Sequence, residues 1–168
     1  MDEVFGTHTK AADAGYAEAQ AALGTWRLTS YLSGVTDDPD DALQWLERAS
    51  AQGEPHAMEQ LGMFYVEYGR RTGRLDPERG VELFRRCTDT TQHTACTFAY
   101  ATALDRGIGG MRDAVRAYAM YLLSNSREPS TKTKARLDEI ATKLSNADIA
   151  RAHAIANQMA ARGGRAGR

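Results

Sequence analysis

Small and apolar residues recur along this chain at a spacing of about 38 residues. Residues 15–24 and residues 53–62 share Gly, Ala, Leu and Gly at matching positions. A fainter third copy follows, in which Ala95 matches Ala57. Self-similarity at a fixed period of this length is typical of repeat arrays, in which each copy is one supersecondary unit. The spacing therefore predicts three similar structural units in a row.

Each copy is predicted to form two helices. In the first helix of the first copy, apolar residues fall at i, i+3, i+4 and i+7, the stripe of an amphipathic helix. The second helix starts at Asp38-Pro39, where the Asp side chain can cap the helix and Pro lacks an N–H that would be unpaired anyway. Asp76-Pro77 repeats this start one copy later. The first stripe consists of Ala19, Ala22, Leu23 and Trp26.

These patterns predict an all-α fold without strands, an α/α superhelical repeat solenoid of helix-turn-helix units. We expect one solenoid over residues 1–162, followed by a disordered tail at 163–168. Its parts are a partial repeat or cap at 2–14, repeats at 15–52, 53–90 and 91–126, and capping helices at 131–161. The expected helices are 16–31, 39–51, 55–68, 77–88, 92–105, 112–125, 131–144 and 146–161.

Two further local predictions follow from the same positions. Ser145 and Asp148 form a capping-box pattern at the start of the last helix. The residues that recur on the apolar stripes should form the core. This predicted core consists of Leu23, Trp26, Leu46, Leu61, Phe64, Leu83 and Phe84.

The combined pattern over roughly residues 10–126 resembles the Sel-one-like repeat, a relative of the tetratricopeptide repeat. Arg27 and Ala99-Tyr100 depart from it, because the family usually has Tyr and Leu-Gly there. The motif residues are Ala19, Leu23, Gly24, Gly34, Val35, Asp38, Ala42, Trp45, Arg48, Ala49 and Gly53.

The resemblance implies a concave side lined by the first helices, which would hold a peptide or helical segment of another protein. The predicted contact residues are mildly acidic as a group, so a basic amphipathic peptide would suit them. They are Glu18, Thr25, Leu28, His56, Glu59, Met63, Val66, Glu67, Thr97, Ala101 and Leu104. The function predicted is therefore a protein-binding scaffold or adaptor. An alternative is that the chain is a structural fragment of a larger repeat scaffold.

A second alternative is an enzyme. Some cysteine-rich relatives of the family have been linked to penicillin binding and β-lactam hydrolysis. Serine enzymes of that kind need Ser-x-x-Lys, whereas Ser130 is followed by Lys132 and Lys134 at the wrong spacing. No other catalytic motif is present, and His56 with Glu59 offers only two ligands at helical spacing, too few for a metal site. We expect no catalytic residues, no cofactor and no metal.

Charge narrows the partners further. The formal net charge is −1, so no overall field favours nucleic acid or an anionic membrane. The first inter-helix loop is acidic and the second is basic, and equivalent loops of a repeat array lie next to each other. We therefore expect these loops to pair with each other. The charged residues are Asp37, Asp38, Asp40 and Asp41 in the first loop and Arg70, Arg71, Arg74 and Arg79 in the second.

The two cysteines, Cys87 and Cys96, allow two interpretations. They can be small buried residues, or they can be bridged as in the cysteine-rich relatives of the family. Cys87 lies one residue before the position that bridges in those relatives, which would rotate it by about 100° around its helix. We therefore predict two free, buried cysteines. The start of the chain shows no signal peptide, which predicts a cytoplasmic protein, or an extracytoplasmic one if the cysteines are bridged or the chain is a fragment.

Overall fold

The computed structural model of the chain describes residues 9–36 and 38–166, with side chains described as far as residue 162. In these residues every long regular element is a helix, and no strand occurs. Residues 9–13 are helical, while residues 2–8 of the predicted cap lie outside the described part. The main elements are α2 (Ala17–Leu32), α3 (Asp40–Ala51), α4 (Pro55–Val66), a short 3-10 helix (Tyr68–Thr72), α5 (Pro77–Thr91), α6 (Thr94–Arg106), α7 (Ala114–Arg127), α8 (Thr131–Ala141) and α9 (Asn146–Ala166).

The chain divides into two compact units, Met1–Leu75 and Asp76–Arg168. Unit 1 contains α2 to α4, and unit 2 contains α5 to α9. Each unit has its own internal packing. The single solenoid over residues 1–162 stays a prediction.

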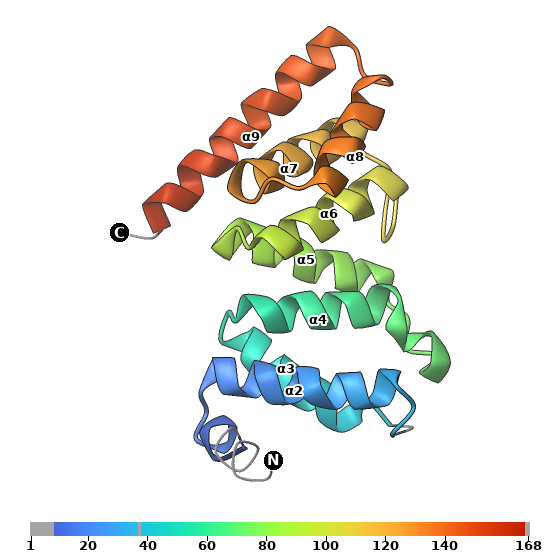
Figure 1. Ribbon diagram of the computed structural model, residues 1–168, viewed down its shortest axis with the longest axis vertical. Helices are drawn as coiled ribbons and strands as arrows, with labels where there is room; N and C mark the ends of the chain where they lie inside the picture. The colour runs from blue at the N-terminus through green and yellow to red at the C-terminus, as the bar shows by residue number, and fades with distance from the viewer. Residues whose placement is uncertain (1–8, 37, 167–168) are drawn as a thin grey trace. The chain divides into compact units, whose positions relative to one another are not determined.

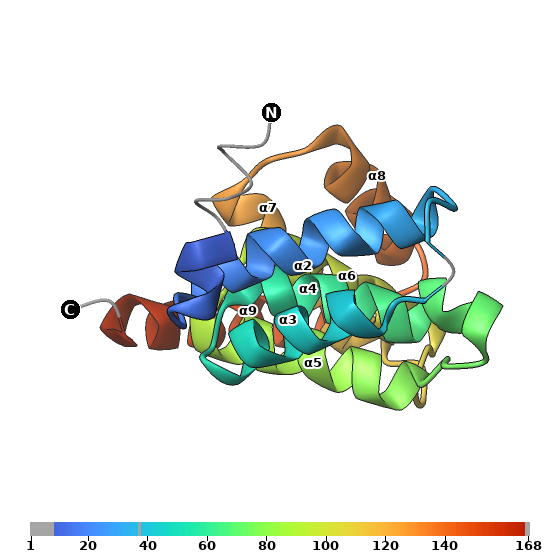
Figure 2. The ribbon, with the colours of Figure 1, turned by 90° about the horizontal axis from the view of Figure 1, so that it is seen from below.

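In unit 1, α2 packs along α3, and α3 packs along α4 (Figure 1, Figure 2). Gly24 of α2 lies directly against Leu46 of α3. A Cβ atom on Gly24 would lie only 2.7 Å from Leu46 Cγ, so any larger residue would push the two helices apart. Leu46 is completely buried as a result, and the predicted core residues Leu23, Leu61 and Phe64 are also buried.

The prediction that Trp26 lies in the core is wrong, because 49% of its side chain is exposed. Phe64, the matching residue of the second copy, is covered by Tyr31 of α2, with ring centroids 6.3 Å apart. Trp26 belongs to the first copy, and the described residues before α2 leave half of it open. The buried face of α2 is formed by Gln20, Ala21, Leu23, Gly24, Leu28 and Tyr31.

The charged loops of unit 1 meet at one ion pair, while Asp41 of the first loop pairs with Arg27 of α2 instead. Arg74, which follows the 3-10 helix, forms an ion pair with Asp40 at the start of α3. Its hydrogen bond lowers the pKa of the Asp40 carboxyl. Arg71 donates a hydrogen bond of 3.1 Å to the carbonyl of Tyr31, and its guanidinium lies 4.9 Å from the centre of that ring. These contacts hold the loop after α4 against the end of α2.

In unit 2, α6 packs between α5 and α7, and α7 is covered by α8 and α9 (Figure 1). The buried carboxylate of Asp105, at the end of α6, receives Arg112 Nη2 at 3.2 Å and Arg136 Nη2 at 2.7 Å. These two ion pairs tie the loop after α6 and the helix α8 to one point. Phe84 is buried as predicted, but Leu83 is only half-buried. The buried face of α5 is narrow, formed by Gly80, Phe84, Cys87 and Thr88, so Leu83 lies at its edge.

The last helix begins as predicted and ends later than predicted. The hydroxyl of Ser145 accepts the Asp148 N–H at 3.1 Å and donates to Asp148 Oδ2 at 2.7 Å, which confirms the capping interaction. The same hydroxyl lowers the pKa of Asp148.

The predicted disordered tail is wrong for residues 163–166, which continue α9, while residues 167–168 lie outside the described part. Glycine costs a helix only about 1 kcal/mol relative to alanine, so Gly163-Gly164 does not stop it as proline would.

The prediction of two free cysteines is also wrong, because Cys87 and Cys96 form a disulfide. Only Gln92 and His93 separate α5 from α6, and Gln92 adopts a left-handed conformation with φ of 51°. This short turn sets the rotation of one helix relative to the other, and it brings the two Cα atoms to 6.0 Å. The position of Cys87 on its own helix could not give that rotation.

A substitution in the core tests which face of α4 is buried. Leu61→Ala should lower the free energy of unfolding by about 2–5 kcal/mol, because it leaves a cavity beneath α4. Urea unfolding followed by far-UV circular dichroism measures this loss. As a control, Leu32→Ala removes a side chain that is 41% exposed and should cost no more than about 1 kcal/mol. Equal losses in the two variants would contradict this assignment of the core.

The disulfide has a direct mass signature. Protein purified in air without reductant should be lighter than the reduced chain by two hydrogen atoms, and a thiol-alkylating reagent should leave it unmodified. Intact-mass spectrometry before and after reduction checks both. Two alkylated cysteines in folded, never-reduced protein would contradict the bridge.

Candidate functional site

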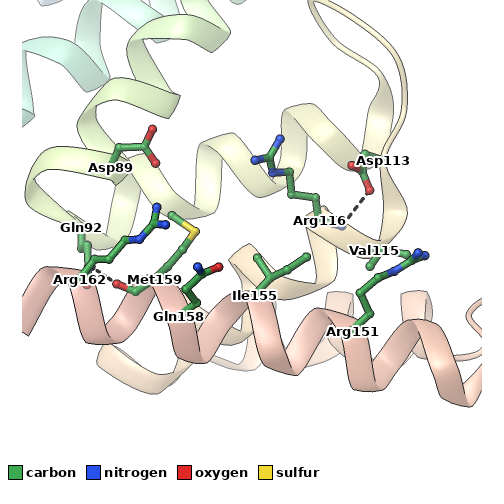
Figure 3. Close-up of a pocket in the computed structure, with 10 residues that line it drawn as sticks. All are labelled: Asp89, Gln92, Asp113, Val115, Arg116, Arg151, Ile155, Gln158, Met159 and Arg162. Carbon is green, nitrogen blue, oxygen red and sulfur yellow. Dashed lines mark hydrogen bonds between the residues drawn. The ribbon is translucent and has the colours of Figure 1, made fainter.

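The candidate site is a pocket in unit 2 with a volume of about 660 Å³ (Figure 3). Its walls are the end of α5, the start of α7 and the length of α9. The lining residues are Asp89, Gln92, Asp113, Val115, Arg116, Arg151, Ile155, Gln158, Met159 and Arg162.

Three apolar side chains line part of the pocket. Ile155 and Met159 are one helical turn apart on α9, and Val115 lies in the first turn of α7. All three are half-buried, so each keeps some surface that a ligand can cover. Ala152 and Ala156, on the same helix, are buried, and α9 packs against α7. The helix therefore uses one face for the core and presents the next face to the pocket.

The charged residues of the pocket differ in the hydrogen bonds and ion pairs that they already form. Asp89 receives Arg85 Nη1 at 2.8 Å, and Asp113 accepts the backbone N–H of Arg116 at 2.9 Å as the cap of α7. The two carboxylates thus have partners within their own segments. The cations are Arg116, Arg151 and Arg162, all with exposed side chains. Of these, Arg151 also reaches Asp148 at 2.6 Å. With three arginines and two aspartates, the lining residues carry a net charge of +1.

Gln92 holds the pocket's parts together. Its side chain is buried, with 3% exposed, and its Nε2 donates to the Met159 carbonyl of α9 at 2.6 Å. Its Oε1 accepts a hydrogen bond from Arg127 at the end of α7. One residue of the α5–α6 turn therefore links three helices. A glutamine in a short turn gives no sequence signal for this role.

Three of the eleven contact residues predicted from the sequence are in the core. Leu28 is 1% exposed, and Thr97 and Ala101 are 0% exposed, so they cannot meet a partner. The prediction, which rested on the resemblance to the repeat family, is wrong for these three residues because they face neighbouring helices. The other eight, whose role stays a prediction, are half-buried or exposed, and none lines the pocket; they are Glu18, Thr25, His56, Glu59, Met63, Val66, Glu67 and Leu104.

The chemical candidates of the sequence have structural roles here. The Ser130 hydroxyl accepts the N–H of Thr133 at 3.1 Å and caps α8. On α4, the exposed His56 lies 3.5 Å from the half-buried Glu59. Among the described residues, one group of His, Cys, Asp and Glu side chains is close enough to share an ion, and it consists of Cys87, His93 and Cys96. No helix in the described ranges combines the length and apolar character that a membrane span requires.

Paired helices in series, joined by short turns and capped by one long helix, define a helical repeat protein of the tetratricopeptide-like class. The model of the Sel1 repeat matches residues 17–54, 55–86 and 94–127, together more than half of the chain. The chain belongs to the Sel1 repeat family. The resemblance seen in the sequence is confirmed, and the predicted repeats 15–52, 53–90 and 91–126 differ from these bounds by a few residues.

Solved structures show the same fold. A protective antigen present in uropathogenic Escherichia coli strains, which displays an SLR fold, matches with a TM-score of 0.80 at 21% identity over 94% of this chain. The match spans about a third, 34%, of that antigen. A Sel1 repeat protein from Oxalobacter formigenes matches with a TM-score of 0.65 at 24% identity, over 83% of this chain and 99% of its own. The all-α repeat-solenoid fold predicted from the sequence is confirmed.

The clamp made by Gln92 can be tested by two substitutions at one position. Gln92→Gly keeps the left-handed backbone but removes both side-chain hydrogen bonds, so it should cost about 1–3 kcal/mol of unfolding free energy. Gln92→Ala should cost about 1–2 kcal/mol more, because a Cβ disfavours that conformation. Chemical denaturation of the two variants beside the parent measures these losses. A glycine variant as stable as the parent would show that the clamp contributes nothing.

Proposed function

We propose that this chain is a protein-interaction scaffold and that the pocket between α5, α7 and α9 binds an acidic amphipathic helix of a partner protein. Members of the Sel1 repeat family are often scaffolds of this kind. The observation that carries the proposal is the combination of an apolar strip with an arginine rim in one pocket. The partner would lay its apolar face on the strip and its carboxylates on the rim.

The shape of the pocket suits such a segment. Its volume of about 660 Å³ can accept several side chains and not only one. Ile155 and Met159 are four residues apart on α9, which matches the i and i+4 spacing of an approaching helix. Helix-in-groove recognition uses anchors at these intervals. An amphipathic helix lying along α9 could therefore place apolar anchors against both residues.

The arginines of the pocket would favour partner segments that carry carboxylates. Arginine presents donors in a planar fork that matches a carboxylate. Arg116, Arg151 and Arg162 are exposed, so each ion pair with a partner would add only about 0–1 kcal/mol. The apolar contacts would supply most of the affinity, and the arginines would favour acidic over basic segments.

A binding role agrees with the residues in the pocket. The ten lining residues include no Ser, Cys, His or Lys, and the two carboxylates among them, Asp89 and Asp113, are engaged by Arg85 and by the N–H that caps α7. This composition supports a scaffold and gives no support to the β-lactam-hydrolysing alternative. The disulfide supports a location outside the cytoplasm, because such bonds persist in oxidising compartments.

Two designed helical peptides test the proposal. Both carry the same leucines at i, i+3 and i+4, and their remaining positions are glutamates in one and lysines in the other. Fluorescence anisotropy should show tighter binding of the glutamate peptide. The double variant Arg116→Glu with Arg151→Glu should weaken that binding by about tenfold, as the loss of two exposed ion pairs implies.

A variant away from the pocket controls for the effect of reversing an exposed cation. Lys134→Glu also reverses an exposed cation in unit 2, on α8 and away from the pocket lining. It should leave the affinity of the glutamate peptide unchanged within about twofold, since a distant exposed charge is screened by salt. Equal binding of both peptides, or an equal loss in the Lys134 variant, would contradict the proposed site.

A further inference from the structure

The turn between α5 and α6 brings three soft metal ligands together. Cys87 comes from α5, Cys96 comes from α6, and His93 lies in the turn as the residue before α6. One ligand atom from each residue lies within 4.8 Å of the other two. Such a cluster combines two sulfurs and an imidazole, which is the donor set that zinc prefers.

His93 has a feature that the disulfide does not explain. Its Nδ1 atom is buried and has no hydrogen-bond partner among the described residues. A buried polar atom without a partner is unfavourable, because it has lost its hydrogen bonds to water and gained none in return. The backbone N–H of the same residue is satisfied, because it donates to the Thr91 hydroxyl at 3.1 Å. Nδ1 is therefore an imidazole nitrogen without a partner among the described residues, and one nitrogen of the same ring lies within 4.8 Å of both sulfur atoms.

The backbone keeps this cluster together by contacts other than the sulfur–sulfur bond. Gln92, next to His93, is fastened to α9 through the Met159 carbonyl and to α7 through Arg127. The Cα atoms of the two cysteines are 6.0 Å apart. Two thiolates that bind one tetrahedral zinc at about 2.3 Å each lie roughly 3.7 Å from each other. Side-chain rotation alone can supply that separation at this Cα distance.

We infer that the α5–α6 turn is a redox-controlled zinc site. In the oxidised chain Cys87 and Cys96 are bridged, and no thiolate is present to bind metal. A dithiol reductant supplies two electrons and two protons, the sulfur–sulfur bond breaks to give two thiols, and the reductant becomes a disulfide. Zinc then displaces the two thiol protons and binds Cys87 Sγ, Cys96 Sγ and the His93 imidazole. This inference does not depend on the proposed binding of a partner helix.

Three protein ligands leave the fourth tetrahedral position of zinc open. Both cysteines are 0% exposed, whereas His93 is half-buried, so the histidine is the side of the cluster nearest to solvent. Water or a small anion would complete the coordination on that side. The ligands would thus be a Cys₂His set with one exchangeable position.

Cobalt and zinc titrations of reduced protein test the inference. The full chain, reduced with a phosphine under nitrogen, should take up one equivalent of Co²⁺ and develop thiolate-to-cobalt charge transfer with the visible bands of tetrahedral cobalt. One equivalent of Zn²⁺ should bleach these bands and protect both thiols from alkylation. Oxidised protein, titrated in the same way but without the phosphine, should show none of the cobalt bands.

Substitutions assign the ligands. His93→Gln should weaken zinc binding by more than about 100-fold, because loss of a direct ligand exceeds the 10–100-fold effect of losing a group that only orients one. His56→Gln, on α4, should bind zinc like the parent. The helix content of each reduced chain is measured in parallel by circular dichroism.

Three results would overturn the inference. The first is a reduced, folded parent that fails to bind metal. The second is a His93→Gln chain, folded like the parent, that binds zinc with the parent's affinity. The third is loss of the helical fold on reduction that zinc does not reverse, since the turn would then not present the ligands together.

Discussion

A pair of helices in this chain cannot cover its own apolar surface, and most of the structure follows from that constraint. In unit 1, Phe64 of α4 is completely buried, and Tyr31 of α2 lies against it. The matching Trp26 stays 49% exposed, since the described residues before α2 do not cover it. Small residues make the covering possible. Gly24 lets α2 approach α3 so closely that Leu46 loses all contact with water. Burial of this kind, at about 25 cal/mol per Å² of apolar surface, supplies the main driving force for the packing.

In unit 2 the same constraint is met by α9, and the candidate site is a consequence. The helix packs along α7 and buries Ala152 and Ala156. Its next face carries Ile155 and Met159 into the pocket, so one element both closes the core and builds the site (Figure 3). Two-sided use of a capping helix explains why the pocket's residues come from segments far apart in the chain. It also explains why the pocket's apolar part is a strip, since only one face of the helix reaches it.

The α5–α6 turn connects the pocket to the cysteine cluster. Gln92, in a left-handed conformation, holds α9 through the Met159 carbonyl, and its neighbour His93 lies beside the two sulfur atoms. Two consecutive residues, Gln92 and His93, therefore connect the pocket to the disulfide between Cys87 and Cys96. The ion pairs of Asp105 with Arg112 and Arg136 fasten the other end of α6. The helix between these two fastenings is held at both ends.

By itself the sequence determined the features that depend on neighbours along the chain. Helix starts at Asp76-Pro77 and Ser145 were predictable because a cap involves only a few consecutive residues. The repeat spacing identified the family and the fold class in the same way. Tertiary structure alone decided the rotation of each helix against its neighbours. That rotation exposed Trp26, joined Cys87 to Cys96, and assembled a pocket from three helices, α5, α7 and α9, that are separated along the chain. The physical reason is that the apolar stripe of a helix identifies the face that will be buried, whereas the packing of side chains from distant segments determines which element covers that face.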